Sequence, residues 1–141
     1  MHAEIHWHDK VHFTATADSG HLISIDGPSD AGGENRGPRP MELVLMGLGG
    51  CSSFDVVSIL TKARQDIVDC RTLIDADRAE DVPHVFTRIH LHFKVSGRNL
   101  DEKKVARAVA LSAEKYCSAS IMLSRGGVEI THGYEVVQAG L

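Results

Sequence analysis

The sequence has few cysteines and few aromatic residues. Three cysteines stand in 141 residues, and none forms the Cys-x-x-Cys spacing of a zinc knuckle or a thioredoxin-like motif. Three are too few for a disulfide framework, so any thiol chemistry has to combine cysteines that are distant in the sequence. Aromatic residues make up 5% of the chain and hydrophobic residues 43%. Small aliphatic side chains therefore fill the core of what we expect to be one domain, residues 1–141.

Clustered positive charge and long apolar runs are also missing. The formal net charge is −4 and the basic residues are scattered, so the chain lacks the basic face that a nucleic acid requires. No apolar run approaches the ~18 residues of a membrane span. The opening residues, MHAEIHWHDK, lack the apolar core of a signal peptide. We therefore expect a cytoplasmic protein with neither nucleic acid nor membrane as a partner.

The hydropathy pattern predicts alternating groups of strands and helices. Alternation of apolar and polar residues predicts half-buried strands over 3–7 and 11–17 and a third strand over 21–26, followed by a Gly- and Pro-rich loop over 27–40. Later segments predict a helix over 41–64, strands over 70–78 and 85–97, a helix after an Asn99/Glu102 capping pair that ends near Cys117, and a strand over 128–138. This order favours an α+β fold with antiparallel sheets over a parallel doubly wound fold.

The helix predicted over 41–64 is apolar on nearly every side in its first half, MELVLMGLGGC. A domain of this size has too little interior to bury such a helix. A second subunit could bury the remaining apolar surface of the helix, and we therefore predict a homodimer.

Three glycines precede Cys51 inside this helix. Gly47, Gly49 and Gly50 cost roughly 1 kcal/mol each relative to alanine, so their missing side chains must permit close approach of another backbone or of a ligand. Glu42 is about 13 Å from Cys51 along the helix axis, so it could act at the thiol only from a partner subunit. Its alternative role is that of a carboxylate that stabilises the first helical turn.

Two segments resemble a known family. RPMELVLMGLGGCSSFDVVSIL (39–60) and VARAVALSAEKYCSASIML (105–123) are similar to the matching parts of the OsmC family, which includes osmotically inducible protein C and the organic hydroperoxide resistance proteins. The resemblance covers essentially the whole chain. It implies an OsmC-like fold with a long central cysteine-bearing helix, a second helix, and an intertwined homodimer with sites at the interface.

The resemblance also implies a thiol peroxidase reaction in oxidative stress defence. Cys51 holds the position of the peroxidatic cysteine and Cys117 that of the resolving cysteine, with an external dithiol as reductant and neither metal nor another cofactor required. An apolar pocket would favour organic hydroperoxides. With Glu42, these two cysteines are the predicted catalytic residues.

Three positions depart from the pattern of the family's peroxidases. Met41 stands where those proteins carry a glutamate, and Ser118 follows the second cysteine in place of proline. They also use an arginine from the N-terminal strands, whereas this chain has none before Arg36. Lys10, Arg36 or Arg39 would have to replace it. The chain therefore resembles a less characterised branch of the family.

Two other functions remain open from the residues. The predicted dimer could hold an apolar small ligand, or sense redox state, without efficient peroxidase turnover. Histidines on shared strand faces could chelate a divalent cation, although such alternation is typical of a solvated face; these are His2, His6 and His8, and His90 and His92. Cys70 lies outside both matching segments, and we interpret it as structural.

Overall fold

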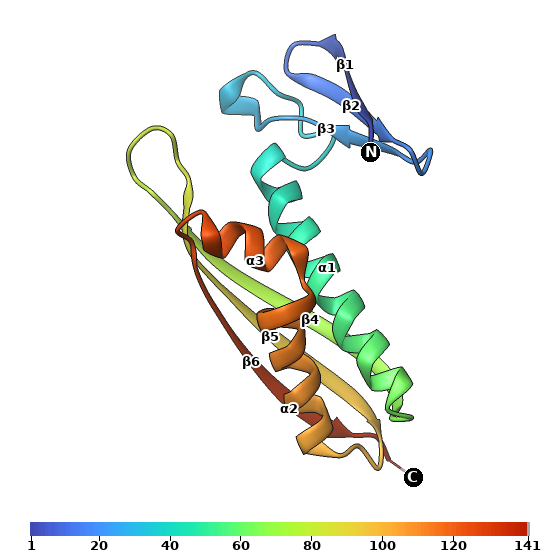
Figure 1. Cartoon of the computed structure of the whole chain (residues 1–141). Helices are drawn as coiled ribbons and strands as arrows, with labels where there is room; N and C mark the ends of the chain where they lie inside the picture. The colour runs from blue at the N-terminus through green and yellow to red at the C-terminus, as the bar shows by residue number, and fades with distance from the viewer. Residues whose placement is uncertain (141) are drawn as a thin grey trace. The chain divides into compact units, whose positions relative to one another are not determined.

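The computed structural model describes residues 1–140. The chain divides into two compact units, the first spanning Met1–Met46 and the second running from Gly47 to the end of the described chain. The boundary falls within the long helix α1 (Pro40–Lys62). Figure 1 shows the elements of both units in chain order by colour.

The N-terminal unit contains a three-stranded antiparallel sheet. Its strands are β1 (Ala3–Asp9), β2 (His12–Ala17) and β3 (Leu22–Ile25), in that order, which confirms the predicted meander. The predicted half-burial is not found for β1: every residue of this strand is exposed, and Trp7 retains 59% of its accessible surface. Within the described N-terminal unit, therefore, no residue covers the apolar side of this strand.

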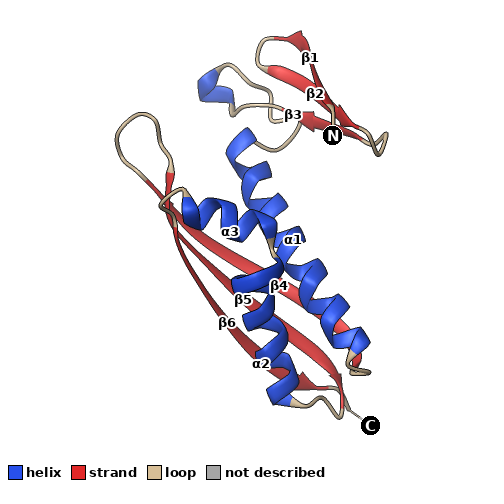
Figure 2. Cartoon of the chain, viewed as in Figure 1, coloured by secondary structure: helices blue, strands red, loops and turns tan. Residues whose placement is uncertain are grey.

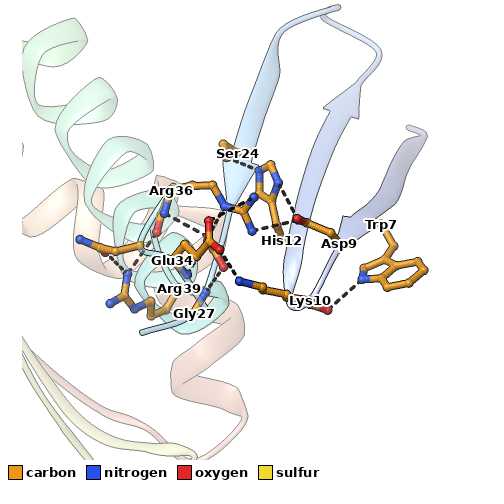
Figure 3. A network of polar contacts seen from close by, with 12 residues as sticks. Trp7, Asp9, Lys10, His12, Ser24, Gly27, Glu34, Arg36 and Arg39 are labelled. Carbon is orange, nitrogen blue, oxygen red and sulfur yellow. Dashed lines mark hydrogen bonds and ion pairs between the residues drawn. The ribbon is translucent and has the colours of Figure 1, made fainter. Parts of the chain in front are cut away.

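A buried carboxylate organises the loop that follows β3 (Figure 3). Asp26 accepts hydrogen bonds from the backbone N–H groups of Gly27, Glu34 and Arg36 and from Nε of Arg36 at 2.8 Å. The Arg36 guanidinium is the main cause that holds the pKa of Asp26 well below its usual range. Arg36 also pairs with Asp9 at 2.9 Å, so the loop, with its short 3-10 helix η1 (Ser29–Ala31), is tied to the sheet of its own unit.

Helix α1 starts and ends close to the predicted bounds. Pro40 is its first residue, Glu42 accepts the backbone N–H of Arg39 at 2.8 Å, and Lys62 lies in the last turn; all three suit their ends of a helix. In the described chain its buried residues lie mainly on one stripe with a four-residue spacing: Leu48, Gly49, Ser52, Val56 and Leu60. Other apolar residues of α1 stay exposed, among them Phe54 at 75%.

The hydropathy of α1 bears on the expectation that no apolar run is long enough to span a membrane. It has 23 residues, and its most apolar 18-residue window reaches a mean hydropathy of 1.8, so by length and composition it could cross a membrane. Isolated polar residues interrupt the apolar run, but they do not lower its mean hydropathy enough to exclude a membrane span. A single helix of this kind is weak evidence for a membrane span, because core helices of soluble proteins meet the same criteria.

The C-terminal unit is built on a second three-stranded sheet. Strands β4 (Asp66–Arg78), β5 (Phe86–Arg98) and β6 (Glu129–Gln138) lie in that order. The β4–β5 pair is antiparallel, as predicted, but β6 runs parallel to β5. The expectation of purely antiparallel sheets is wrong here because the chain crosses over through helices between β5 and β6, and such a crossover returns a strand in parallel.

Helices cover one face of this sheet (Figure 2). They are the C-terminal part of α1, α2 (Glu102–Leu111), a π-helical turn η2 (Ser112–Tyr116) and α3 (Ser118–Arg125). The hydrophobic core lies between them and the sheet and consists of Leu48, Val56, Leu60, Phe86, Ile89, Leu91, Phe93, Val95, Leu100, Val105, Ala108, Val109 and Cys117. The α+β fold class is confirmed.

Two local predictions for this region are wrong. The side chain that caps α2 is Asp101, which accepts the N–H of Lys103 at 2.9 Å, whereas Asn99 has a positive φ of 50° in the preceding turn. Asp101 directly precedes the first helical residue, the position at which a short acceptor side chain satisfies a free N–H group. The chain also continues beyond Cys117 into the unpredicted helix α3.

Candidate functional site

The structure brings the two predicted thiols together. Cys51 lies on α1, and Cys117 lies where η2 ends and α3 begins. Together with Asp55, they place two sulfur atoms and a carboxylate oxygen within 4.8 Å of one another. Both cysteines are reduced; Cys117 is buried and Cys51 is partly exposed. External reagents therefore reach the pair from the Cys51 side.

Cys117 sits in a fully buried, polar pocket. Its Sγ lies 3.1 Å from Oγ of Ser52 and accepts the backbone N–H of Ser120 at 3.3 Å, which makes it the N-cap of α3. Burial raises the pKa of the Cys117 thiol, and the neighbouring Cys51 adds to the rise, while the Ser52 and Ser120 hydrogen bonds oppose it. The site thus favours the neutral thiol at Cys117, although Ser52 and Ser120 both form hydrogen bonds with its sulfur.

The π-helical turn supplies a second set of contacts. Oγ of Ser112 donates to the backbone carbonyl of Ser52 at 3.1 Å and lies 3.4 Å from Oδ2 of Asp55. Burial raises the pKa of Asp55, and the Ser112 hydrogen bond opposes that rise. Within the described residues, no basic side chain pairs with this carboxylate. The widened turn thereby links the segment before Cys117 to the helix that carries Cys51.

Sequence reasoning missed three residues of this site: Ser52, Asp55 and Ser112. A signal existed for Asp55, since Cys51 and Asp55 are four residues apart and must share one face of a helix. No comparable signal existed for Ser112, because a sequence gives no spacing between segments that meet only in the tertiary fold.

Glu42 and the candidate basic residues belong to the N-terminal unit. Glu42 bonds to the backbone N–H of Arg39, which is the helix-stabilising role left open by the sequence. Each basic residue is engaged within its own unit: Lys10 with Glu34, Arg36 with Asp26 and Asp9, and Arg39 with Asn35. An active role for Glu42 therefore stays a prediction.

The cluster of Cys51, Asp55 and Cys117 contains none of the remaining candidates among the described residues. Cys70 is on β4, where burial raises its pKa. The rings of His6 and His8 lie 4.6 Å apart and those of His90 and His92 lie 6.5 Å apart. Two of these rings bond to threonine hydroxyls, His8 to Thr14 and His90 to Thr131, as expected for polar faces of strands.

Comparison with known proteins places this chain in a family. The sequence profile described as OsmC-like protein matches residues 32–133. Protein YhfA of Escherichia coli strain K12 is 52% identical over 139 residues, covering 99% of this chain and 100% of the relative. A hypothetical protein from Aquifex aeolicus has a crystal structure that is 29% identical with a TM-score of 0.85, over 99% of this chain and 97% of that one.

A more distant structure shows the same fold. It is the organic hydroperoxide resistance protein OsmC from Legionella pneumophila, 18% identical with a TM-score of 0.69 over 94% of each chain. Three findings agree: the profile match, the α+β architecture, and the paired cysteines on α1 and before α3. The chain belongs to the OsmC-like family.

Proposed function

We propose that the chain is a thiol-dependent organic hydroperoxide reductase that uses Cys51 as the peroxidatic and Cys117 as the resolving cysteine. The observation that carries this proposal is the proximity of the two reduced thiols, one partly exposed and one buried. The accessible sulfur suits attack on an external substrate. The buried sulfur suits the later internal step.

The proposed cycle has three steps. The Cys51 thiolate attacks a peroxide oxygen, the O–O bond breaks, an alcohol leaves and Cys51 becomes a sulfenic acid. The Cys117 thiol then attacks this sulfur and water leaves, so that a disulfide forms. An external dithiol reduces the disulfide by exchange and restores both thiols. No metal or organic cofactor takes part, and the need for a reducing dithiol is consistent with a cytoplasmic location.

One observation favours a second function. The partners of Cys117 are uncharged, and the nearby Asp55 is an acid, so the described site provides no cation beside the thiols. A nearby cation is the usual means by which a protein activates a thiol for attack. The second function is therefore an OsmC-like dimer that binds an apolar small ligand or acts as a slow redox switch.

We further propose that the chain works as an intertwined homodimer. Apolar residues of α1 and β1 that one chain leaves exposed, such as Phe54 and Trp7, support this assembly. In the dimer, Glu42 of one subunit would act at Cys51 of the other. Glu42→Gln keeps an oxygen that can accept the Arg39 N–H, so a loss of thiol reactivity without a loss of stability would assign the carboxylate charge to the reaction.

Mass spectrometry after a single oxidation tests the peroxidase function. Fully reduced protein is mixed with one equivalent of an alkyl hydroperoxide, and peptide mapping follows each cysteine with time. The expected product is a rapid Cys51–Cys117 disulfide, which Cys51→Ser abolishes and the matched control Cys70→Ser retains. Thiols that stay unchanged for hours in the wild-type protein would contradict the proposal and favour ligand binding.

A further inference from the structure

We propose that Cys51, Asp55 and Cys117 form a zinc site in the reduced protein and that the disulfide form of the pair has lost this site. Zinc is held in proteins by thiolate sulfur, imidazole nitrogen and carboxylate oxygen, usually with four tetrahedral ligands. Here two sulfur atoms and a carboxylate oxygen lie within 4.8 Å of one another in the C-terminal unit. Three protein ligands leave one position for water.

The first pair of ligands comes from one helix. Cys51 and Asp55 are four residues apart on α1, so their side chains lie one above the other on the same helical face. Two ligands with this spacing can bind the same ion from one side of the helix. Cys117 approaches from another element, at the start of α3, and supplies the third ligand.

Outer contacts already orient two of the three ligands. The Cys117 sulfur has the Ser120 N–H and the Ser52 hydroxyl as partners, and the Asp55 carboxylate has the Ser112 hydroxyl. Such second-layer hydrogen bonds fix ligands in metal sites and strengthen metal binding.

The charge of the site also suits a cation better than it suits a free thiolate. No basic side chain of the described chain pairs with Asp55. When a divalent cation binds, both thiols release their protons to solvent, and two thiolates with one carboxylate compensate the ion. Asp55 also lines a groove together with Lys62, Arg107 and Tyr116, so the carboxylate side of the site faces solvent.

Oxidation and metal binding exclude one another at this site. Formation of the disulfide removes both thiolates, so a bound ion is left with one carboxylate and is released. The inference goes beyond the proposed function, because the site would bind zinc whether or not the pair turns over a hydroperoxide.

Titration of the untagged, fully reduced and chelator-treated chain with Zn²⁺ under anaerobic conditions tests this inference. A chromophoric chelator competes for the ion, and Co²⁺ serves in parallel because thiolate-to-cobalt absorption reports sulfur ligands directly. We expect one ion per chain with sulfur-to-cobalt absorption, and no such site in the disulfide form. Asp55→Asn should weaken binding by at least about 10-fold, the lower end of the effect of losing even an outer partner.

Matched variants locate the ion. Cys51→Ser and Cys117→Ser should each remove the thiolate absorption, whereas Cys70→Ser should leave binding unchanged. Asp81→Asn, on the exposed loop before Pro83, is the control for Asp55→Asn. Binding that survives in the Cys51→Ser/Cys117→Ser double variant would assign the ion to the histidine-bearing strands and overturn the proposal, as would a reduced wild-type chain that binds no zinc.

Discussion

At the scale of single residues, Cys117 combines complete burial with two partners for its sulfur. Burial raises the pKa of its thiol and outweighs the Ser52 and Ser120 hydrogen bonds. The folded state therefore holds the thiol proton more tightly than the unfolded chain does. This difference connects the site to the pH dependence of stability.

We predict that reduced protein loses stability as the pH rises above about 8.5, where the thiol of the unfolded chain ionises. Below this pH both states hold the proton and the contribution of Cys117 is constant. Above it the unfolded state releases the proton first, so the free energy of unfolding falls by at most about 1.4 kcal/mol per pH unit for this thiol, until the folded thiol also ionises.

Chemical denaturation at several alkaline pH values, under reductant, measures this effect. The comparison is Cys70→Ser with the Cys70→Ser/Cys117→Ala double variant, because the pKa of Cys70 is raised as well and would add to the same slope. The difference between their stabilities should shrink as the pH rises. Curves that stay parallel would show that the folded Cys117 thiol ionises no later than the unfolded one.

Only those residues of the site that lie in distinctive sequence segments could be predicted. Cys51 and Cys117 could be predicted because each lies in a distinctive segment that resembles a known family. Ser52 and Ser112 could not, because their contacts join segments about sixty residues apart through the tertiary fold. The electrostatic setting of Cys51 was likewise hidden, since a sequence shows which charges exist and not which of them are already paired.

At the scale of elements, the predicted strands and helices of most of the chain are confirmed because periodicity and end signals agree there. Helix α3 was missed because its eight residues, SASIMLSR, are too few to display a helical period and begin with serines typical of turns. Strand β6 was predicted but its parallel direction was not, because the hydropathy of a strand does not reveal the direction of its neighbour.

The packing of α1 on β4 depends on one glycine. A Cβ added at Gly49 would lie 2.6 Å from Cδ1 of Ile74, whereas nothing lies within 4 Å of one added at Gly47 or Gly50. Among the described residues of the C-terminal unit, Gly49 is the one glycine of these three at which a Cβ would meet another side chain.

We predict that Gly49→Ala and Ile74→Val compensate each other. Alanine alone should force Ile74 out of its position at a cost of about 1–3 kcal/mol, partly offset by about 1 kcal/mol of better helix propensity. Ile74→Val removes the clashing methyl group. A double-mutant cycle measured by denaturation should therefore give a favourable coupling of at least about 0.5 kcal/mol. Ile89→Val, a buried residue on β5, is the control partner and should show no coupling.

At the scale of the whole molecule, the apolar residues that one chain leaves uncovered predict self-association. Phe54 on α1 is 75% exposed, and an aromatic anchor of this kind commonly contributes at least 2 kcal/mol to an interface. Sedimentation equilibrium should show a dimer for the wild-type chain, and Phe54→Ser should raise the dissociation constant by about 10-fold or more. Val82→Ser alters a residue that is 84% exposed in a loop and should leave the dimer intact. A monomeric wild-type chain would contradict the prediction, and equal effects of both substitutions would show that α1 does not carry the interface.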